Sequence, residues 1–256
     1  MRIRRALTTL ILVVTAACGS KTPQKPTTPR APIIVPDVMP GWGRTQSSQA
    51  AAKPKVQVRG IEGTLHNFDV KVTIERHNKQ FAVCQEAPAR RVPMLSGTIE
   101  FGIHVRHSGE VSDVDLRTSD VGDRELERCF IDVIRGVHFP RPNGGDANVV
   151  YTMLLGPAGK GGEPEQWNAG RVQHLVAKHG ADVREECSLP TGEAYTVTAY
   201  INASGKVISA GVAGRAMSDA ERFDCIADKL SHWSMPKPTK KRIAKVTFPL
   251  RSSGQS

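Results

Sequence analysis

Aromatic residues and long apolar runs are both scarce in this sequence. Only 5% of the 256 residues are aromatic, although 39% are hydrophobic. After the N-terminus, no stretch approaches the roughly 20 consecutive apolar residues that a membrane-spanning helix needs. The sequence therefore predicts a body without membrane-spanning helices. Its apolar residues are sufficient for two domains of about 100 residues, each with a modest core.

Motifs that bind metals or phosphates are also missing. No Cys-x-x-Cys pair offers zinc ligands, and no Lys-Ser or Lys-Thr follows the glycine turn 143–146. His104 and His107 lie three residues apart, so on a strand they point to opposite faces. His77 and His179 have no second ligand beside them, which favours a structural role. We expect no metal site and no cofactor.

Carboxylates are plentiful, but their spacing predicts a solvated surface. They fall on an expected turn and on an expected exposed helix face: Asp113, Asp115, Asp120, Asp123, Glu125 and Glu127. No neighbouring group is implied that would shift a pKa for acid–base work, and no nucleophile–base set can be assembled. The sequence predicts that the protein is not an enzyme.

Acidic residues are outnumbered, and the formal net charge is +10. The excess is uneven, with +5 on residues 19–55 and −2 on residues 56–155. A nucleic-acid binder is expected to gather basic residues on a folded face. Here most of the excess precedes the expected folded body, which argues against nucleic acid and favours weak attraction to anionic envelope surfaces.

The N-terminus has the parts of a secretory signal. Arg2, Arg4 and Arg5 precede the apolar stretch 6–14, and Thr15-Ala16-Ala17-Cys18 follows. Residues 1–17 resemble a lipoprotein signal, which implies that Cys18 is lipidated and anchors the protein to a membrane. Gly19-Ser20 then favours the periplasmic side of the outer membrane. The alternative is ordinary secretion, with cleavage after Ala17 and a free Cys18 thiol.

Residues 18–55 predict an extended tether between this anchor and the folded body. Prolines recur among Thr, Ser, Lys and Gln, and such a composition cannot bury enough apolar surface to order itself.

An internal repeat dominates the rest of the chain. At an offset of 96 residues, the alternating strand 99–105 overlays 195–201, and Ser108-Gly109 overlays Ser204-Gly205. Cys129 then falls on Cys225, Asp123 (a plausible helix start) on Asp219, and Val150 on Val246 in a closing strand.

Each repeat also has an amphipathic helix before its first strand. Apolar residues share one helical face in both repeats: Val70, Ile74, Phe81 and Cys84 in the first, and Val172, Val176, Val183 and Cys187 in the second. The predicted fold class is α+β, with two tandem helix-strand-strand-helix-strand modules at 56–155 and 165–251. Each module is a small antiparallel sheet covered by two helices, with its other face and its edges free.

Four cysteines remain after Cys18, two in each module. In each module one ends the first helix and one lies in the second, on faces that pack on the same sheet. We expect the pairs Cys84–Cys129 and Cys187–Cys225 in an oxidising periplasm. The alternatives are a metal site or buried free thiols.

The order of these elements resembles a known family. The segments that carry the resemblance are Leu95-Ser96-Gly97-Thr98-Ile99-Glu100-Phe101, Ser108-Gly109-Glu110-Val111, Cys129 and Val137-His138-Phe139-Pro140-Arg141-Pro142. They are similar to the AgmX/PglI C-terminal domain, a variant of the TonB C-terminal fold; the second module matches more loosely, with Met235 in place of Phe139. The resemblance implies an envelope protein linked to gliding motility or TonB-like transmission, without chemistry of its own.

Two binding hypotheses follow. The first is a docking or scaffolding role in which an envelope protein adds a strand to the uncharged closing strand of the first module, at Val149, Val150, Tyr151 and Met153. Its counterpart in the second module contains Pro249 and Lys245, which discourage pairing. The alternative is binding of peptidoglycan or another anionic polymer through Lys237, Lys240, Lys241 and Arg242.

Overall fold

The computed structural model describes residues 56–60, 63–157, 162–214, 220–239 and 242–251. The expected signal peptide at 1–17, the lipidation site Cys18 and the tether at 18–55 lie outside these residues. All described residues belong to one compact unit, Pro36–Ser256. Within them, no helix is long and apolar enough to cross a membrane.

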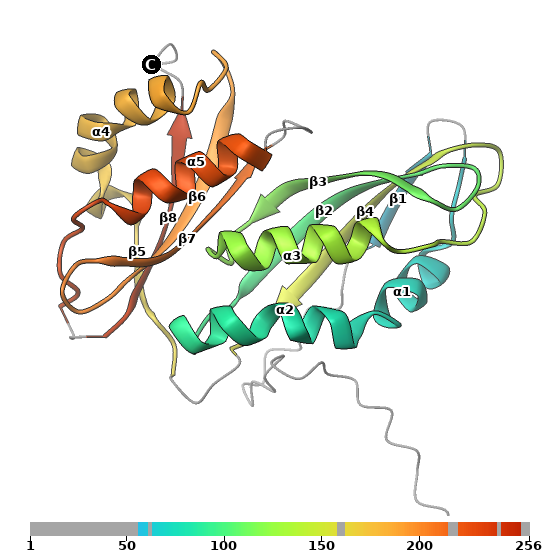
Figure 1. The fold of residues 1–256 in the computed structure, drawn as a ribbon, viewed down its shortest axis with the longest axis horizontal. Helices are drawn as coiled ribbons and strands as arrows, with labels where there is room; N and C mark the ends of the chain where they lie inside the picture. Colours follow the sequence, from blue (N-terminus) through green and yellow to red (C-terminus); the bar gives the residue numbers. More distant parts are fainter. Residues whose placement is uncertain (1–55, 61–62, 158–161, 215–219, 240–241, 252–256) are drawn as a thin grey trace, which may run out of the picture. The chain divides into compact units, whose positions relative to one another are not determined.

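The first module contains four strands and three helices (Figure 1). In chain order they are β1 (Val56–Gly60), α1 (Asn67–Glu75), α2 (Asn78–Arg91), β2 (Gly97–Val105), β3 (Val111–Ser119), α3 (Arg124–Arg135) and β4 (Ala147–Leu155).

The second module repeats this plan with shorter strands and with η1 in place of α1. They are β5 (Glu165–Trp167), the 3₁₀ helix η1 (Ala169–Arg171), α4 (Gln173–Glu186), β6 (Ala194–Ile201), β7 (Val207–Gly214), α5 (Ala220–Ser231) and β8 (Ala244–Arg251). The predicted α+β class with two small, mostly antiparallel sheets is confirmed.

Each sheet has four strands, so the expectation of three was wrong. The orders are β1-β4-β2-β3 and β5-β8-β6-β7. The additional strand is antiparallel β1 in the first sheet and parallel β5 in the second. These strands span five and three residues, which is too short for hydrophobic alternation to identify them.

The predicted alternation places one face of each hairpin in a core. In β2, Ile99, Phe101, Ile103 and Val105 are at most 1% exposed, and in β6, Tyr195, Val197, Ala199 and Ile201 are at most 2% exposed. The closing strands correct the repeat offset. Phe101 pairs with Tyr151 and Val197 with Phe248, so β8 follows β4 by 97 residues, and Val149 (not Val150) corresponds to Val246.

The first predicted helix is broken into two at Arg76 and His77. Its apolar face is nevertheless buried at Val70, Ile74 and Phe81. Because the face continues in phase across the break, periodicity could not reveal it. The predicted helix start at Asp123 is confirmed, since its side chain accepts a hydrogen bond from Leu126 N at 2.9 Å as the N-cap of α3.

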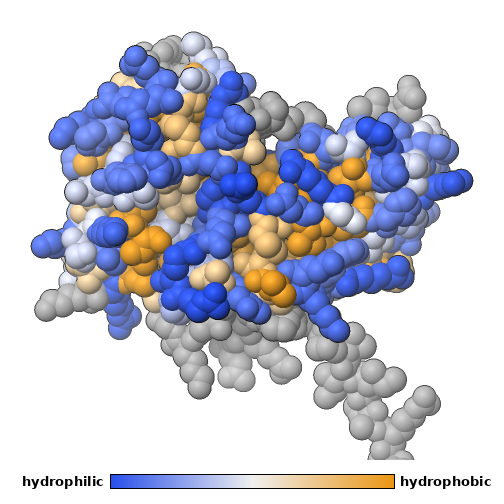
Figure 2. Space-filling model, in the orientation of Figure 1, coloured by the Kyte–Doolittle hydropathy of each residue, from blue (hydrophilic) through white to orange (hydrophobic). Residues whose placement is uncertain are grey.

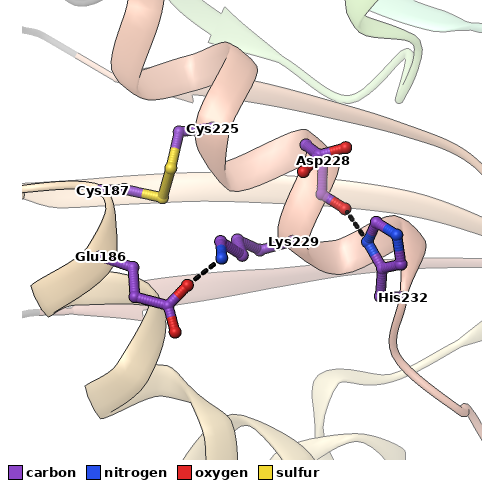
Figure 3. The surroundings of a disulfide bond; sticks show 6 residues. All are labelled: Glu186, Cys187, Cys225, Asp228, Lys229 and His232. Carbon is purple, nitrogen blue, oxygen red and sulfur yellow. Dashed lines mark hydrogen bonds and ion pairs between the residues drawn. A yellow bond between two sulfur atoms is a disulfide. The ribbon is translucent and has the colours of Figure 1, made fainter.

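Both predicted disulfides are confirmed. Cys84 is bonded to Cys129 and Cys187 to Cys225, with Cα atoms 5.7 Å apart in each pair. The first bond joins α2 to α3, and the second joins the C-terminal end of α4 to α5. Figure 3 shows the second bond, next to the ion pair between Glu186 and Lys229.

Non-reducing peptide mapping checks this connectivity. We expect a Cys84–Cys129 peptide and a Cys187–Cys225 peptide from the oxidised protein. A peptide that joins the modules, such as Cys84 to Cys187, would contradict the structure.

Candidate functional site

The strand predicted to accept a partner is not an edge strand. β4 lies between β1 and β2, and β1 pairs with it from Ala147 to Tyr151. Three of the proposed contact residues, Val149, Tyr151 and Met153, point into the core and are at most 4% exposed. The expectation that the β4 backbone is free at Val149, Val150 and Tyr151 was wrong, because β1 already occupies that side.

The closing strand of the second module is open over its second half. Glu165 N of β5 donates to Ile243 O at 2.9 Å, so the backbone of Ile243 points toward β5 and away from β6. Backbone direction alternates along a strand, so every second residue of β8 after Ile243 also points away from β6. Pro249 is one of these residues. It has no backbone N–H, but at this position the N–H would point away from β6, so the pairing with β6 loses no hydrogen bond. Proline therefore marks this stretch as an edge that resists strand addition.

Lys245 does not guard this edge as expected. Its side chain is 8% exposed and lies on the second face of the sheet, the face without helices. Of the predicted polymer-binding residues, Lys237 and Arg242 are exposed. Lys240 and Lys241 lie outside the described residues.

The candidate histidines have separate surroundings. His104 Nδ1 lies 2.8 Å from Asn148 Oδ1, His77 Nδ1 lies 3.0 Å from Thr73 O, and the His179 ring lies 5.5 Å from that of Trp233. In the part of the chain that the structure describes, no group of three or more His, Cys, Asp or Glu is placed to hold a metal ion.

Two carboxylates expected at the surface are buried. Asp123 and Glu127, one turn apart on α3, are 1% and 0% exposed. They lie against β7 of the second module, so the prediction of a solvated surface was wrong for both. Glu125, on the opposite side of α3, keeps the predicted exposure at 59% of its side chain.

Asp123 holds three elements together. Oδ1 caps α3, while Oδ2 accepts a hydrogen bond from Arg91 Nη2 at 2.9 Å and lies 2.7 Å from Ser209 Oγ. Ser209 Oγ also lies 2.8 Å from Gly122 O. Asp123 thus connects α2 and α3 of the first module to β7 of the second.

Glu127 covers the edge of β7. Its Oε2 accepts a hydrogen bond from Val212 N at 3.2 Å, and its Oε1 accepts one from the Ser119 hydroxyl at 2.7 Å. Burial raises the pKa of Glu127 to about 8, and its hydrogen bonds only partly offset that effect. Both donors are neutral, and the Arg124 guanidinium, which also lowers the pKa, is bonded to Asp224 and not to Glu127.

A second group of contacts joins the modules at the second face of the β6–β8 sheet. The Tyr200 hydroxyl lies 3.2 Å from both N and O of Ser96, and Lys245 Nζ donates to Ser96 O at 2.8 Å. Burial lowers the pKa of Lys245, and Asp120, 3.6 Å away, counteracts this. Tyr200 and Thr198 are at most 1% exposed, so the expected free face of the second sheet is covered at these residues, while Thr196 and Pro249 stay exposed.

Ion pairs also join the helices of the two modules. Arg124 is 8% exposed and donates from Nε to Asp224 Oδ1 at 2.7 Å, with its guanidinium carbon 5.3 Å from the centre of the Phe223 ring. Arg128 reaches the other oxygen of Asp224 at 3.0 Å. We name the buried contacts of Asp123, Arg124, Glu127, Ser209 and Val212 the junction.

Gly211 permits this close approach. A Cβ atom there would lie 2.4 Å from Glu127 Oε1 and 2.8 Å from both Asp123 N and Gly122 Cα. At the equivalent position the first module has Asp115, and in place of Ser209 it has Asp113. Carboxylates at these places leave no room for a second helix start like that of α3, and they would repel carboxylates placed like those of Asp123 and Glu127.

Gly211→Ala is therefore expected to destabilise the protein by about 1–3 kcal/mol, because backbone atoms must move to admit the methyl group. Denaturant unfolding measures the loss. Gly136→Ala is the matched control, since its Cβ would have no contact closer than 3.5 Å; we expect a change below about 1 kcal/mol. Equal effects in the two variants would contradict the junction.

A groove of about 750 Å³ lies beside the junction, between α2 and α3. Cys129 and Val133 give it apolar walls, and His77, Gln80 and Arg128 are among its polar lining. Figure 2 shows hydrophobic residues between these helices, framed by hydrophilic ones. Arg128 is already paired with Asp224, and the groove brings together no nucleophile with a base.

The chain matches no protein-family profile, no curated protein and no solved structure. The resemblance to the AgmX/PglI C-terminal domain therefore stays a prediction.

Proposed function

We propose that this protein is a non-enzymatic envelope lipoprotein that acts as a periplasmic docking and scaffolding element. The observation that carries the proposal is the junction, which joins two modules through buried hydrogen bonds and ion pairs into one compact unit. A joined pair of sheets holds its remaining surfaces in a fixed relation, which suits a scaffold. The predicted lipid on Cys18 and the gliding or TonB-like context belong to the same proposal.

Among the described strands, β3 is the best candidate for strand addition. It pairs only with β2 among the described strands and is nine residues long, and its end at Ser119 lies near β7. The other sheet edges offer less: β1 has five residues, β5 has three, β8 contains Pro249, and Glu127 covers β7. An extended partner segment would gain main-chain hydrogen bonds along β3 with little demand on its side chains.

Photo-crosslinking in intact envelopes tests this assignment. A crosslinking residue in place of Ser112 or Arg117, both exposed on β3, is expected to give one discrete protein adduct. The control position is Ala177, on the exposed face of α4. No adduct from β3, or the same adduct from Ala177, would contradict docking at β3.

Cys18→Ala is expected to release the protein from membranes in detergent partitioning, because the predicted anchor is a lipid on that thiol. The comparison needs the mature, exported protein in both samples. Unchanged partitioning of the variant would contradict lipidation.

A second candidate function is binding of peptidoglycan or another anionic polymer, favoured by the exposure of Lys237 and Arg242. Their attraction to a polyanion falls as salt screens it. Salt-sensitive pelleting with isolated peptidoglycan, reduced by Lys237→Ala with Arg242→Ala, would support this candidate. Pelleting that the double variant leaves unchanged would rule out these residues.

A further inference from the structure

The carboxyl group of Glu127 occupies a place where a charge is costly. It is 0% exposed, and its hydrogen-bond donors are the Ser119 hydroxyl of β3 and Val212 N of β7. Burying a carboxylate without a paired cation carries a large penalty, which a bound proton removes.

The nearby charged groups offset this penalty only in part, since Arg124 attracts the carboxylate but burial still raises its pKa. Arg124 of α3 directs its Nε and Nη2 to Asp224 Oδ1 and Ala220 O, on or next to α5. Arg91 of α2 is bonded to Asp123 and Glu125. Asp123, one turn before Glu127 on α3, is a carboxylate and opposes a second negative charge.

We propose that Glu127 makes the junction a pH-sensitive clasp, closed while its carboxyl group is protonated and released as it ionises. Release separates α3 from β7 and uncovers Val212 N–H at the edge of the second sheet. This concerns the protein's own two modules and does not depend on lipidation or on docking at β3.

The direction of the effect follows from proton linkage. In the closed state the pKa of Glu127 is raised to about 8, and in an open, solvated state it returns to the ordinary 4.5. Between these values the closed state holds a proton that the open state lacks, so the opening constant rises about tenfold per pH unit. Below the lower value the closed state has its full stability, and above the higher value the constant levels off.

Amide hydrogen exchange of the full-length oxidised protein tests the clasp. The protection factor of Val212, corrected for the intrinsic pH dependence of exchange, is expected to fall about tenfold per pH unit between about pH 5 and 8. Glu127→Gln keeps the shape of the side chain but cannot ionise, and we expect its protection factor to be independent of pH. Glu125→Gln, on the exposed side of the same helix, is expected to keep the wild-type slope.

Carbon-13 titration of the Glu127 carboxyl group supplies a measurement on the unaltered protein, so the test survives if a variant misfolds. A midpoint well above 4.5 together with a sloping protection factor is the expected result. A midpoint near 4.5, a flat wild-type profile, or a slope that persists in Glu127→Gln would overturn the proposal.

Discussion

Asp123→Ala is expected to lower the free energy of unfolding by about 2–4 kcal/mol, from the loss of a helix N-cap and of buried hydrogen bonds. The change removes the N-cap of α3 and takes one acceptor each from the Arg91 guanidinium, which keeps Glu125, and from the Ser209 hydroxyl, which keeps Gly122 O. Equilibrium denaturation in urea measures the loss. Native domains are stable by about 5–15 kcal/mol, so a folded variant should remain for study.

Glu125→Ala is the matched control for Asp123→Ala. Both carboxylates are bonded to the same Arg91, at 2.7 Å for Glu125 and 2.9 Å for Asp123, but the side chain of Glu125 is 59% exposed and that of Asp123 only 2%. Exposed ion pairs contribute at most about 1 kcal/mol. If the two variants lost similar stability, the burial of Asp123 in the junction would be wrong.

Removal of either disulfide is the second large effect. The bonds close loops of 45 and 38 residues, and the chain-entropy relation assigns each about 4 kcal/mol at 25 °C. Cys84→Ala with Cys129→Ala, and Cys187→Ala with Cys225→Ala, should therefore destabilise the protein almost equally, since the dependence on loop length is logarithmic. Thermal unfolding of the two double variants checks this, and a loss below about 1 kcal/mol in either would contradict it.

Local patterns in the sequence were sufficient for the modules themselves. The alternation at 99–105 and 195–201 identifies the central strands, and the helical spacing of Phe81 with Cys84 identifies the face that carries a disulfide. Each pattern reports burial within about a dozen residues of chain. The pairing of β1 with β4 joins segments about 90 residues apart, and five residues carry too little pattern to show it.

The junction could not be predicted because its residues have the pattern of a solvated surface. Asp123 and Glu127 stand beside the exposed charges Glu125 and Arg128, and Ser209 lies on the polar face of β7. Polar residues on a sheet face are expected in water unless another element supplies partners. The one available signal was Gly211, where a strand without a side chain permits close approach of another backbone.

The junction joins the two modules, and coincidence of their unfolding transitions tests this most directly. The sequence has three tryptophans, Trp42 before the described residues and Trp167 and Trp233 in the second module. In a Trp42→Phe background, fluorescence therefore reports the second module, while far-ultraviolet circular dichroism reports both. If the modules are joined, both signals have the same urea midpoint. Asp123→Ala in the first module should then lower the midpoint of the tryptophan signal together with that of the circular dichroism signal. Two separate transitions, with the tryptophan midpoint unmoved by Asp123→Ala, would contradict the account.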